Sequence, residues 1–313
     1  MDRVFYKNSD VALIVPTKDR PGKIKNLLVS LTEQNVDCLI IIVDGGKSVK
    51  DVVQLFEDRL NIEYFKSDIP GQIHQRNIGI SKIKENIRLV GFIDDDIIFK
   101  KNALSEMLSF WNTVEETTAG ISFNVITDSK ESYSIFSKFQ PKKKGKVLRT
   151  GHNTPIINID ETIRSQWLAG GCTIWRKDII FKFKQSPLKT RWAVGEDVRF
   201  SYPIGKKFPL YVCVNAKVEE DDHAYLKSHP ISFYKYQGKK TTLAIFYFVS
   251  NHSELSKKLF VCSTILKVTI KMIISLLRLS KQNIAYTSGQ IEALYVIFKS
   301  FCGFSNILIE LED

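Results

Sequence analysis

An alternation of short apolar runs with amphipathic segments, over the first third of the chain, most constrains what this sequence can fold into. Apolar runs rich in β-branched residues, typical of buried strands, occupy residues 11–17, 38–46, 61–67 and 89–96. Segments with apolar side chains at helical spacing occupy residues 22–34, 49–60, 73–83 and 103–114. This order predicts an α/β fold with a mostly parallel sheet flanked by helices. Ligands of such sheets bind beyond the carboxyl ends of the strands.

The middle of the chain continues this pattern less regularly. Residues 127–164 contain many lysine, glycine and proline residues and predict a long loop. Two further strands are expected at residues 168–176 and 210–220. A short helix is expected to begin at the acidic pair Glu196 and Asp197.

The composition narrows the classes of protein to which the chain can belong. Hydrophobic residues make up 44% of the 313 residues and charged residues 25%, which excludes disordered, collagen-like and disulfide-scaffold chains. The formal net charge of +11 favours anionic partners such as nucleic acid, a phosphorylated substrate or membrane lipid. Five scattered cysteines without a CxxC pair predict reduced cytosolic thiols instead of a zinc cluster or disulfides. The polar N-terminal segment lacks the apolar core of a signal peptide.

Three consecutive aspartates, Asp94, Asp95 and Asp96, end the strand predicted at residues 89–96. In an extended chain, Asp94 and Asp96 point to one side and Asp95 points to the other. Clustered carboxylates repel one another unless a cation joins them, and Mg²⁺ and Mn²⁺ prefer such oxygen ligands. The triplet therefore indicates either a divalent-cation site or a solvated acidic turn.

A second acidic element, Glu196 and Asp197, directly follows Gly195. One of these carboxylates could act as a general base toward a substrate. Acids that open a helix and complement its dipole give the same pattern more often. The glycine pair Gly170 and Gly171 permits a ligand to approach the backbone closely, although paired glycines also mark β-bulges.

Six segments of the chain together resemble one protein family. In chain order they are VALIVPTKDRPGKIKNLLVSL, IIIVDGG, GQIHQRNIGI, VGFIDDD, WLAGGCTIWR and VGEDVRFS. Each segment is moderately specific, but all six in this order resemble the family 2 glycosyltransferases of the GT-A fold, over residues 11–223. The resemblance implies an inverting transfer of a sugar from a nucleotide-diphosphate donor, with a UDP-sugar favoured, to an acceptor hydroxyl. It identifies residues 1–225 as the catalytic domain and leaves residues 226–313 as a separate helical region.

The resemblance implies a donor site at the ends of the first strands. Its donor-binding residues are Pro16, Thr17, Arg20, Asp44, Gln72, Arg76, Asn77, Asp94 and Asp95. Asp44 is similar to the acid that accepts a hydrogen bond from the imide N–H of uracil or thymine. Arg76 is a suitable charge partner for the donor phosphates.

The resemblance also implies a divalent metal ion, a catalytic base and an acceptor side. Mg²⁺ or Mn²⁺ is expected to bind Asp96 first, with Asp94 and His223 as further ligands. Asp197 resembles the general base of the family, and Glu196 resembles its supporting neighbour. The residues expected on the acceptor side are Trp167, Gly170, Gly171 and Trp192.

The C-terminal region carries most of the basic excess. Residues 235–281 contain nine basic residues and one acidic residue, a formal difference of +8. One predicted helix collects on a common face Ser263, Lys267, Lys271, Ser275, Arg278 and Lys281. The broad apolar remainder is typical of a helix that lies in a membrane interface, here the cytoplasmic face of the cell membrane. A lipid-linked or cell-surface glycan acceptor would suit that location.

Three alternatives stay open at this point. The C-terminal helices could instead pack on the catalytic domain or form a homo-oligomer, with their basic face in water. The basic charge and the KKKGK segment would suit a nucleic-acid-binding protein, but the sequence has no nucleic-acid-binding signature, so no nucleic-acid partner is expected. A nucleotidyltransferase could use the Asp94–Asp96 metal site, but PTKDRPGK is a poor version of the triphosphate-binding loop that such an enzyme needs.

Overall fold

The computed structural model describes residues 5–34, 37–127, 143–185, 194–221 and 229–312. Contacts divide the chain into two compact units. The described parts of Met1–Lys146, Thr154–Pro187 and Phe200–Ala224 form the sheet unit. The described parts of Val147–Asn153, Leu188–Arg199 and Tyr225–Asp313 form the helical unit. The helical unit thus includes two short segments from the range 1–225, and the division into domains at residues 225 and 226 stays a prediction.

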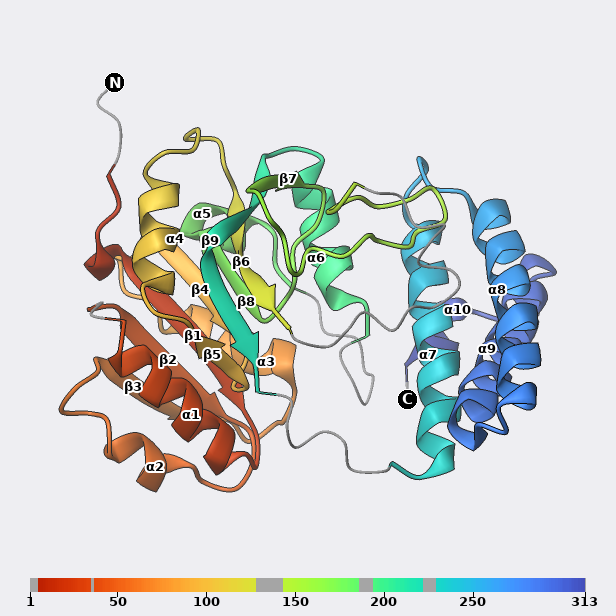
Figure 1. The fold of residues 1–313 in the computed structure, drawn as a ribbon, viewed down its shortest axis with the longest axis horizontal. Helices are drawn as coiled ribbons and strands as arrows, with labels where there is room; N and C mark the ends of the chain where they lie inside the picture. The colour runs from red at the N-terminus through yellow and green to blue at the C-terminus, as the bar shows by residue number, and fades with distance from the viewer. Residues whose placement is uncertain (1–4, 35–36, 128–142, 186–193, 222–228, 313) are drawn as a thin grey trace. The chain divides into compact units, whose positions relative to one another are not determined.

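The sheet unit is built on one mixed sheet (Figure 1). Among the described residues this sheet has nine strands, in the order β3-β2-β1-β4-β8-β6-β9-β5, and β7 pairs with β9. The first four are parallel neighbours: β3 (Ile62–Lys66), β2 (Leu39–Asp44), β1 (Val11–Thr17) and β4 (Leu89–Ile93). The others are β8 (Cys172–Arg176), β6 (Gly120–Ile126), β9 (Leu210–Glu220), β5 (Ile97–Phe99) and β7 (Ile163–Ser165). Of these, β6 and β9 are parallel, and the remaining pairs are antiparallel.

Helices cover both faces of the parallel strands, which confirms the predicted α/β fold. The helices that follow these strands are α1 (Pro21–Thr32), α2 (Lys50–Gln54), α3 (Gln72–Ser81), α4 (Ala103–Trp111), α5 (Lys177–Lys182) and α6 (Glu196–Gly205), and a 3-10 turn, η1 (Asn8–Asp10), precedes β1. Leu13 and Val15 of β1 share one core cluster with apolar residues of α1 and α4. On the opposite face, Ile14 meets α3 so closely that a Cβ on Gly79 would overlap its side chain. Each fully buried aliphatic side chain contributes about 1.5–3 kcal/mol to this core.

Two expectations about local structure are wrong. The helix expected over residues 49–60 stops at Gln54, after which the chain turns and exposes Leu55. Strand β6, in the middle of the sheet, has no counterpart among the predicted strands. Its buried Ser122 and Asn124 interrupt the apolar pattern, and both donate hydrogen bonds to backbone carbonyls of neighbouring segments. A polar residue in a central strand is stable only with such partners, which a sequence does not reveal.

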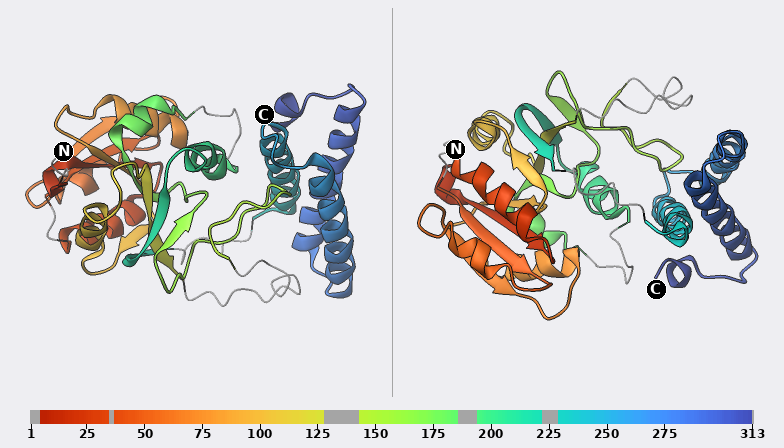
Figure 2. Two further views of the ribbon diagram at one scale, coloured as in Figure 1. Left: turned by 90° about the horizontal axis from the view of Figure 1, so that it is seen from above. Right: turned by 60° about the horizontal axis from the view of Figure 1, so that its bottom comes forward.

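The helical unit contains α7 (Ile231–Ser250), α8 (Lys257–Leu277), α9 (Lys281–Phe301) and α10 (Ile307–Leu311). In the views of Figure 2, α9 runs along both α7 and α8, and it contacts both. Two glycines allow the approach of α7 and α9, because a Cβ on Gly238 or on Gly289 would overlap a carbonyl group of the facing helix. Lys240 of α7 is buried and donates hydrogen bonds to three carbonyl oxygens at the C-terminal end of α10.

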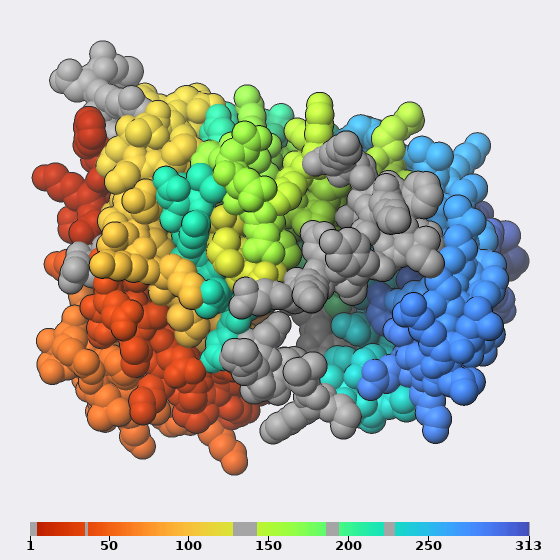
Figure 3. All heavy atoms as spheres, in the orientation of Figure 1, coloured from red at the N-terminus to blue at the C-terminus, as the bar shows by residue number. Residues whose placement is uncertain are grey.

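The outer side of α8 is apolar. Its buried side is formed by Phe260, Val261, Thr264, Val268 and Ser275. Lys271 extends over the ring of Tyr286 on α9, with Nζ 4.0 Å from the ring centroid, and burial lowers the pKa of Lys271. Leu266 and Leu277 are 60% and 80% exposed. Figure 3 shows α8 at the surface of the helical unit.

The prediction that Ser263, Lys267, Lys271, Ser275, Arg278 and Lys281 share one face of a single helix is wrong. α8 ends at Leu277 with Arg278 as its C-cap, and Lys281 already belongs to α9. Between them, Leu279 adopts φ 50° and interrupts the helical path. The predicted helices are confirmed, and within α8 it is Lys271 that packs on a neighbouring helix while Leu266 and Leu277 are exposed.

Candidate active site

The acidic turn Asp94–Asp96 lies at the carboxyl end of β4. The Asp94 N–H donates to the Gly171 carbonyl at 2.7 Å, which ties the turn to the residue before β8. The aspartates form a turn instead of extended chain, so the alternation expected for their side chains is wrong. Arg20 Nη1 contacts Asp95 Oδ1 at 2.8 Å and Asp96 Oδ2 at 3.1 Å. One guanidinium thus offsets part of the charge of two neighbouring carboxylates.

Asp95 connects this turn to the segment at the end of β1. Its buried carboxylate accepts a hydrogen bond from Thr17 Oγ1 at 2.7 Å and pairs with Arg20. Burial raises the pKa of Asp95 despite these two partners. Pro16 is also buried, inside β1. Because both oxygens of Asp95 are engaged within the protein, Asp95 positions Thr17 and Arg20 at the mouth of the site.

Asp94 is held by side chains from α3. Gln72 Nε2 and Arg76 Nη2 both donate to Asp94 Oδ1, at 2.6 and 2.8 Å. Arg76 is 1% exposed, and its guanidinium carbon lies 5.3 Å from the centroid of the Phe92 ring. On the other side, a Cβ on Gly171 would overlap the Asp94 carboxylate, so only glycine fits there. This arrangement fixes the Asp94 carboxylate at the carboxyl end of β4.

Asp96 is the last aspartate of the turn. Its side chain is 24% exposed and contacts Arg20. Burial, together with the charges of Asp94 and Asp95, raises the pKa of Asp96 to about 6. A partly buried carboxylate beside two other carboxylates is stabilised in its charged form by a bound cation. The described residues contain no group of three or more His, Cys, Asp and Glu residues that could hold a metal ion, so a cation here would take further oxygen ligands from a donor diphosphate.

Asp44, at the end of β2, is fully buried. Its Oδ1 accepts from the Gly46 N–H, and its Oδ2 accepts from the Val49 N–H, the Tyr64 hydroxyl and Lys66 Nζ. Burial alone would raise the pKa of Asp44, but these hydrogen bonds outweigh it and hold the pKa below its usual range. The sequence singled out neither Tyr64 nor Lys66, because they reach Asp44 only through the pairing of β2 with β3.

The face that each residue occupies on α3 decides what it can touch. Gln72 and Arg76 are four residues apart and share the face toward Asp94. Asn77 lies on a different face and donates to the Gln185 carbonyl at 3.4 Å. Gln75, which the sequence did not single out, is buried and donates to the carbonyls at the ends of β1 and β2, at 2.7 and 2.6 Å. The structure thus brings Gln72 and Arg76 to the acidic turn, but not Asn77.

The residues predicted on the acceptor side differ in accessibility. Trp167 is 9% exposed, and its indole N–H donates to the Thr154 carbonyl at 3.1 Å, so its main contacts are within the fold. Gly170 and Gly171 are half-buried before β8. Trp192 and His223 lie outside the described residues.

Glu196 and Asp197 form the first turn of α6, after Gly195 in the left-handed region at φ 65°. Glu196 is buried and Asp197 is half-buried. The helix continues into the sheet unit, where the Phe200 ring packs 5.1 Å from the Trp175 ring and Ser201 Oγ accepts from the Leu168 N–H at 2.9 Å. These contacts hold the second turn of α6 in the sheet unit.

The chain is similar to known glycosyltransferases. A sequence model described as "Glycosyl transferase family 2" matches residues 12–180. The Minor teichoic acid biosynthesis protein GgaA of Bacillus subtilis (strain 168) is 23% identical over 175 residues, which are 53% of this chain and 37% of that protein. This chain therefore spans well under half the length of that curated relative.

Solved structures show the same fold. The S. aureus TarS 1-349 structure superposes with a TM-score of 0.52 at 15% identity, covering 96% of this chain and 89% of that chain. A structure of GalNAc-T7 with UDP, GalNAc and Mn²⁺ has a TM-score of 0.50 at 14% identity, covering 68% of this chain and 44% of that chain. The family match covers more than half of the residues, and it includes the acidic turn and α3. The chain therefore belongs to glycosyl transferase family 2 and has the GT-A fold.

Proposed function

We propose that this protein transfers a sugar, with inversion, from a UDP-sugar to a hydroxyl group of a cell-surface or lipid-linked glycan. The observation that carries the proposal is the acidic turn, in which Arg20 and Arg76 pair with the aspartates while the Asp96 side chain stays 24% exposed. Such an arrangement is suited to a diphosphate, because the partly exposed Arg20 guanidinium and a cation on Asp96 would together offset its charge.

The residues present fit a divalent cation of the kind that family 2 enzymes commonly use. Asp96 supplies one accessible carboxylate, and Asp94 and His223 remain the predicted further ligands. When bound, Mg²⁺ or Mn²⁺ would offset the charge that develops on the departing diphosphate.

Asp197 is proposed as the general base, and Glu196 as its support. The acceptor oxygen attacks the anomeric carbon while its proton passes to Asp197, and the bond from that carbon to the diphosphate oxygen breaks. The nucleoside diphosphate leaves with the bonding electron pair. Trp167, Trp192, Gly170 and Gly171 remain the predicted acceptor side. A single displacement of this kind inverts the anomeric configuration.

The uracil base is proposed to bind near Asp44. Asp44 Oδ1 accepts a hydrogen bond from Gly46, whereas Oδ2 accepts three. Lys66 is the exposed member of this group, with 44% of its side chain accessible. Displacement of Lys66 would open a path for an imide N–H to donate to Asp44. Solved relatives include TarS 1-349 in complex with UDP-GlcNAc, which supports a UDP-sugar as the donor to test first.

A nucleotide-binding panel tests the donor proposal. We expect UDP with Mn²⁺ to raise the melting temperature more than UDP or Mn²⁺ alone, and more than GDP, CDP, dTDP or ADP with Mn²⁺. Asp96→Asn should lose the metal-dependent part of this shift, whereas Asp58→Asn, at an exposed position on the surface, should keep it. A panel in which no nucleotide changes the melting temperature of the folded protein would contradict the proposal.

The outer face of α8 supports a second part of the proposal, a location on the membrane. α8 is long and apolar enough to cross a membrane by length and composition alone, with a mean hydropathy of 1.9. Lys271, however, extends over the ring of Tyr286 on the packed side, whereas Leu266, Ile273 and Leu277 are exposed, so the helix carries an apolar outer side. A one-sided apolar helix with Lys257 and Lys258 at one end and Arg278 at the other is suited to lie in the interface of an anionic membrane. This would place the enzyme on the cytoplasmic face, beside a lipid-linked acceptor.

Vesicle flotation tests this location. The protein should float with vesicles that contain anionic lipid, and Leu266→Asp should abolish flotation. Leu55→Asp is the matched control, because Leu55 and Leu266 are both 60% exposed and Leu55 lies in the sheet unit. If Leu266→Asp instead converts a dimer to a monomer in light scattering, and the parent protein does not float, the face is an oligomer interface.

A further inference from the structure

A cavity lies in the sheet unit, at the opposite ends of the strands from the acidic turn. It has a volume of about 630 Å³, within the range of small-molecule sites. Arg88 directly precedes β4, and Arg176 pairs with Leu89 at the end of β8. The length of β4 separates these residues from Asp94, roughly 17 Å at the rise of a strand. The cavity is therefore distinct from the proposed donor site.

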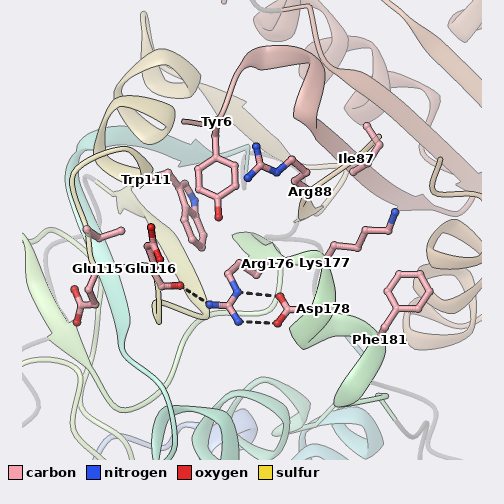
Figure 4. Close-up of a pocket in the computed structure, with 11 residues that line it drawn as sticks. Tyr6, Ile87, Arg88, Trp111, Glu115, Glu116, Arg176, Lys177, Asp178 and Phe181 are labelled. Carbon is pink, nitrogen blue, oxygen red and sulfur yellow. Dashed lines mark hydrogen bonds and ion pairs between the residues drawn. The ribbon is translucent and has the colours of Figure 1, made fainter. Parts of the chain in front are cut away.

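Aromatic rings form one wall of this cavity. Tyr6 and Trp111 pack edge to face, with ring centroids 5.8 Å apart, and the Phe181 ring is half exposed at the rim. In Figure 4 the Tyr6 hydroxyl points toward the middle of the ring of lining side chains. Trp111 Nε1 is buried and has no hydrogen-bond partner among the described residues. The groups of this wall that can contact a ligand are thus the partly exposed rings of Tyr6 and Phe181 and the Tyr6 hydroxyl, whereas Trp111 supports Tyr6 from within the core.

The charged residues of the cavity pair with one another. Arg176 donates to both oxygens of Asp178, at 2.9 and 2.6 Å, and to the Glu116 carbonyl, as the dashed lines in Figure 4 mark. The lining contains three basic residues (Arg88, Arg176 and Lys177) and three acidic residues (Glu115, Glu116 and Asp178). Their formal charges cancel, in a chain whose net charge is +11. The cavity therefore does not select for a phosphate or another anion.

We propose that this cavity is an accessory saccharide site, which holds a neutral sugar unit of the acceptor glycan away from the reacting centre. The apolar face of a pyranose ring packs on flat aromatic surfaces, and its hydroxyl groups both donate and accept hydrogen bonds. Tyr6, Phe181 and the Arg176–Asp178 pair present those surfaces and partners together. The identification of the sugar as part of the acceptor rests on the proposed function; the affinity for neutral saccharides does not.

Binding of neutral oligosaccharides to the full chain tests the inference. With calorimetry and tryptophan fluorescence, we expect chitotriose or maltotriose to bind with a dissociation constant below about 10 mM, and inorganic phosphate not to compete. Tyr6→Phe removes one hydroxyl and should weaken binding about three- to tenfold. Phe181→Ser, at the rim, should also weaken it, whereas the control Leu55→Ser should not.

Catalysis separates this inference from the proposed function. For a long acceptor, Tyr6→Phe should raise KM and leave kcat unchanged, and for a monosaccharide acceptor it should change neither. Saccharide binding without any nucleotide binding would contradict the proposed function and still support the accessory saccharide site. Normal transfer with no saccharide binding in the parent protein, or binding that is unaffected in both Tyr6→Phe and Phe181→Ser, would overturn the site.

Discussion

The sheet unit and the helical unit differ in where they place charged and apolar side chains. The sheet unit buries Asp44, Arg76 and Asp95 near the carboxyl ends of its parallel strands, and each has hydrogen-bond partners. The helical unit turns Lys271 inward over Tyr286 and exposes Leu266 to its surroundings. Buried charges are costly unless paired, and exposed apolar surface is costly in water.

This difference indicates what kind of ligand or surface each unit binds. Paired charges at a strand edge prepare a site for a small, highly charged ligand, because the polar groups are oriented before the ligand arrives. An apolar helix face without charged residues prepares a surface for lipid or for another protein. The following changes test the two units separately.

The largest effect is expected for Asp197→Asn. Removal of a general base typically slows turnover by about 10²- to 10⁴-fold. Donor binding should be unchanged, because donor binding is assigned to the acidic turn and α3 of the sheet unit. Kinetics and calorimetry on the same preparation measure both quantities. If turnover stays near normal, or if donor affinity falls as far as turnover does, Asp197 does not have the role of a base.

A smaller effect is expected for Gly289→Ala in the helical unit. Its new Cβ would overlap the Lys235 carbonyl, so α7 and α9 would have to separate, at a cost of about 1–3 kcal/mol in the free energy of unfolding. Gly22→Ala in α1 is the matched control, because nothing lies within 4 Å of its Cβ. The control should be neutral or stabilising by up to about 1 kcal/mol. Thermal unfolding would contradict this contrast if the two variants behaved alike.

Asp44→Asn should destabilise the sheet unit by about 1–3 kcal/mol at pH 7, because the amide cannot accept from all four present donors. The folded pKa of Asp44 is depressed, so the stability that its charge contributes is present above its unfolded pKa of about 4 and is lost as pH falls through the folded value. Urea unfolding at pH 7, 5 and 3 should show the difference from the parent protein shrinking toward low pH. A difference that grows toward low pH would contradict this assignment.

The smallest effect concerns His152 in the helical unit. Burial, with the charge of Lys267, lowers the pKa of His152 to about 4, and its ring stacks 5.9 Å from Phe260. The unfolded chain binds a proton near pH 6.5 and the folded chain does not, so stability falls as pH drops below that value. Between pH 8 and 6 the loss should be at most about 1 kcal/mol. His152→Gln should remove this part of the pH dependence, and an unchanged profile would show that another group causes it.

Much of the fold follows from local pattern, and the exceptions have identifiable causes. The parallel strands β1, β2, β3 and β4 were predicted because continuous apolar runs are typical of strands buried on both faces. Strand β6 was not predicted because Ser122 and Asn124 interrupt its apolar pattern. Both residues are paired with carbonyls from distant segments, which the sequence does not reveal. The same limit applies to the site. The acidic turn was visible in the sequence, but the contacts of Gln75, Tyr64 and Lys66 depend on how α3 and β3 pack.

The sequence by itself determined most of the elements of this protein, their order and the family to which it belongs, because these depend on neighbouring residues and on short motifs. Only the tertiary structure decided that one arginine, Arg20, reaches both Asp95 and Asp96. It also decided that α8 turns Lys271 toward Tyr286 and Leu266 outward. A helix that is apolar over most of its circumference has no single preferred face, so its orientation is set by the helices that pack against it.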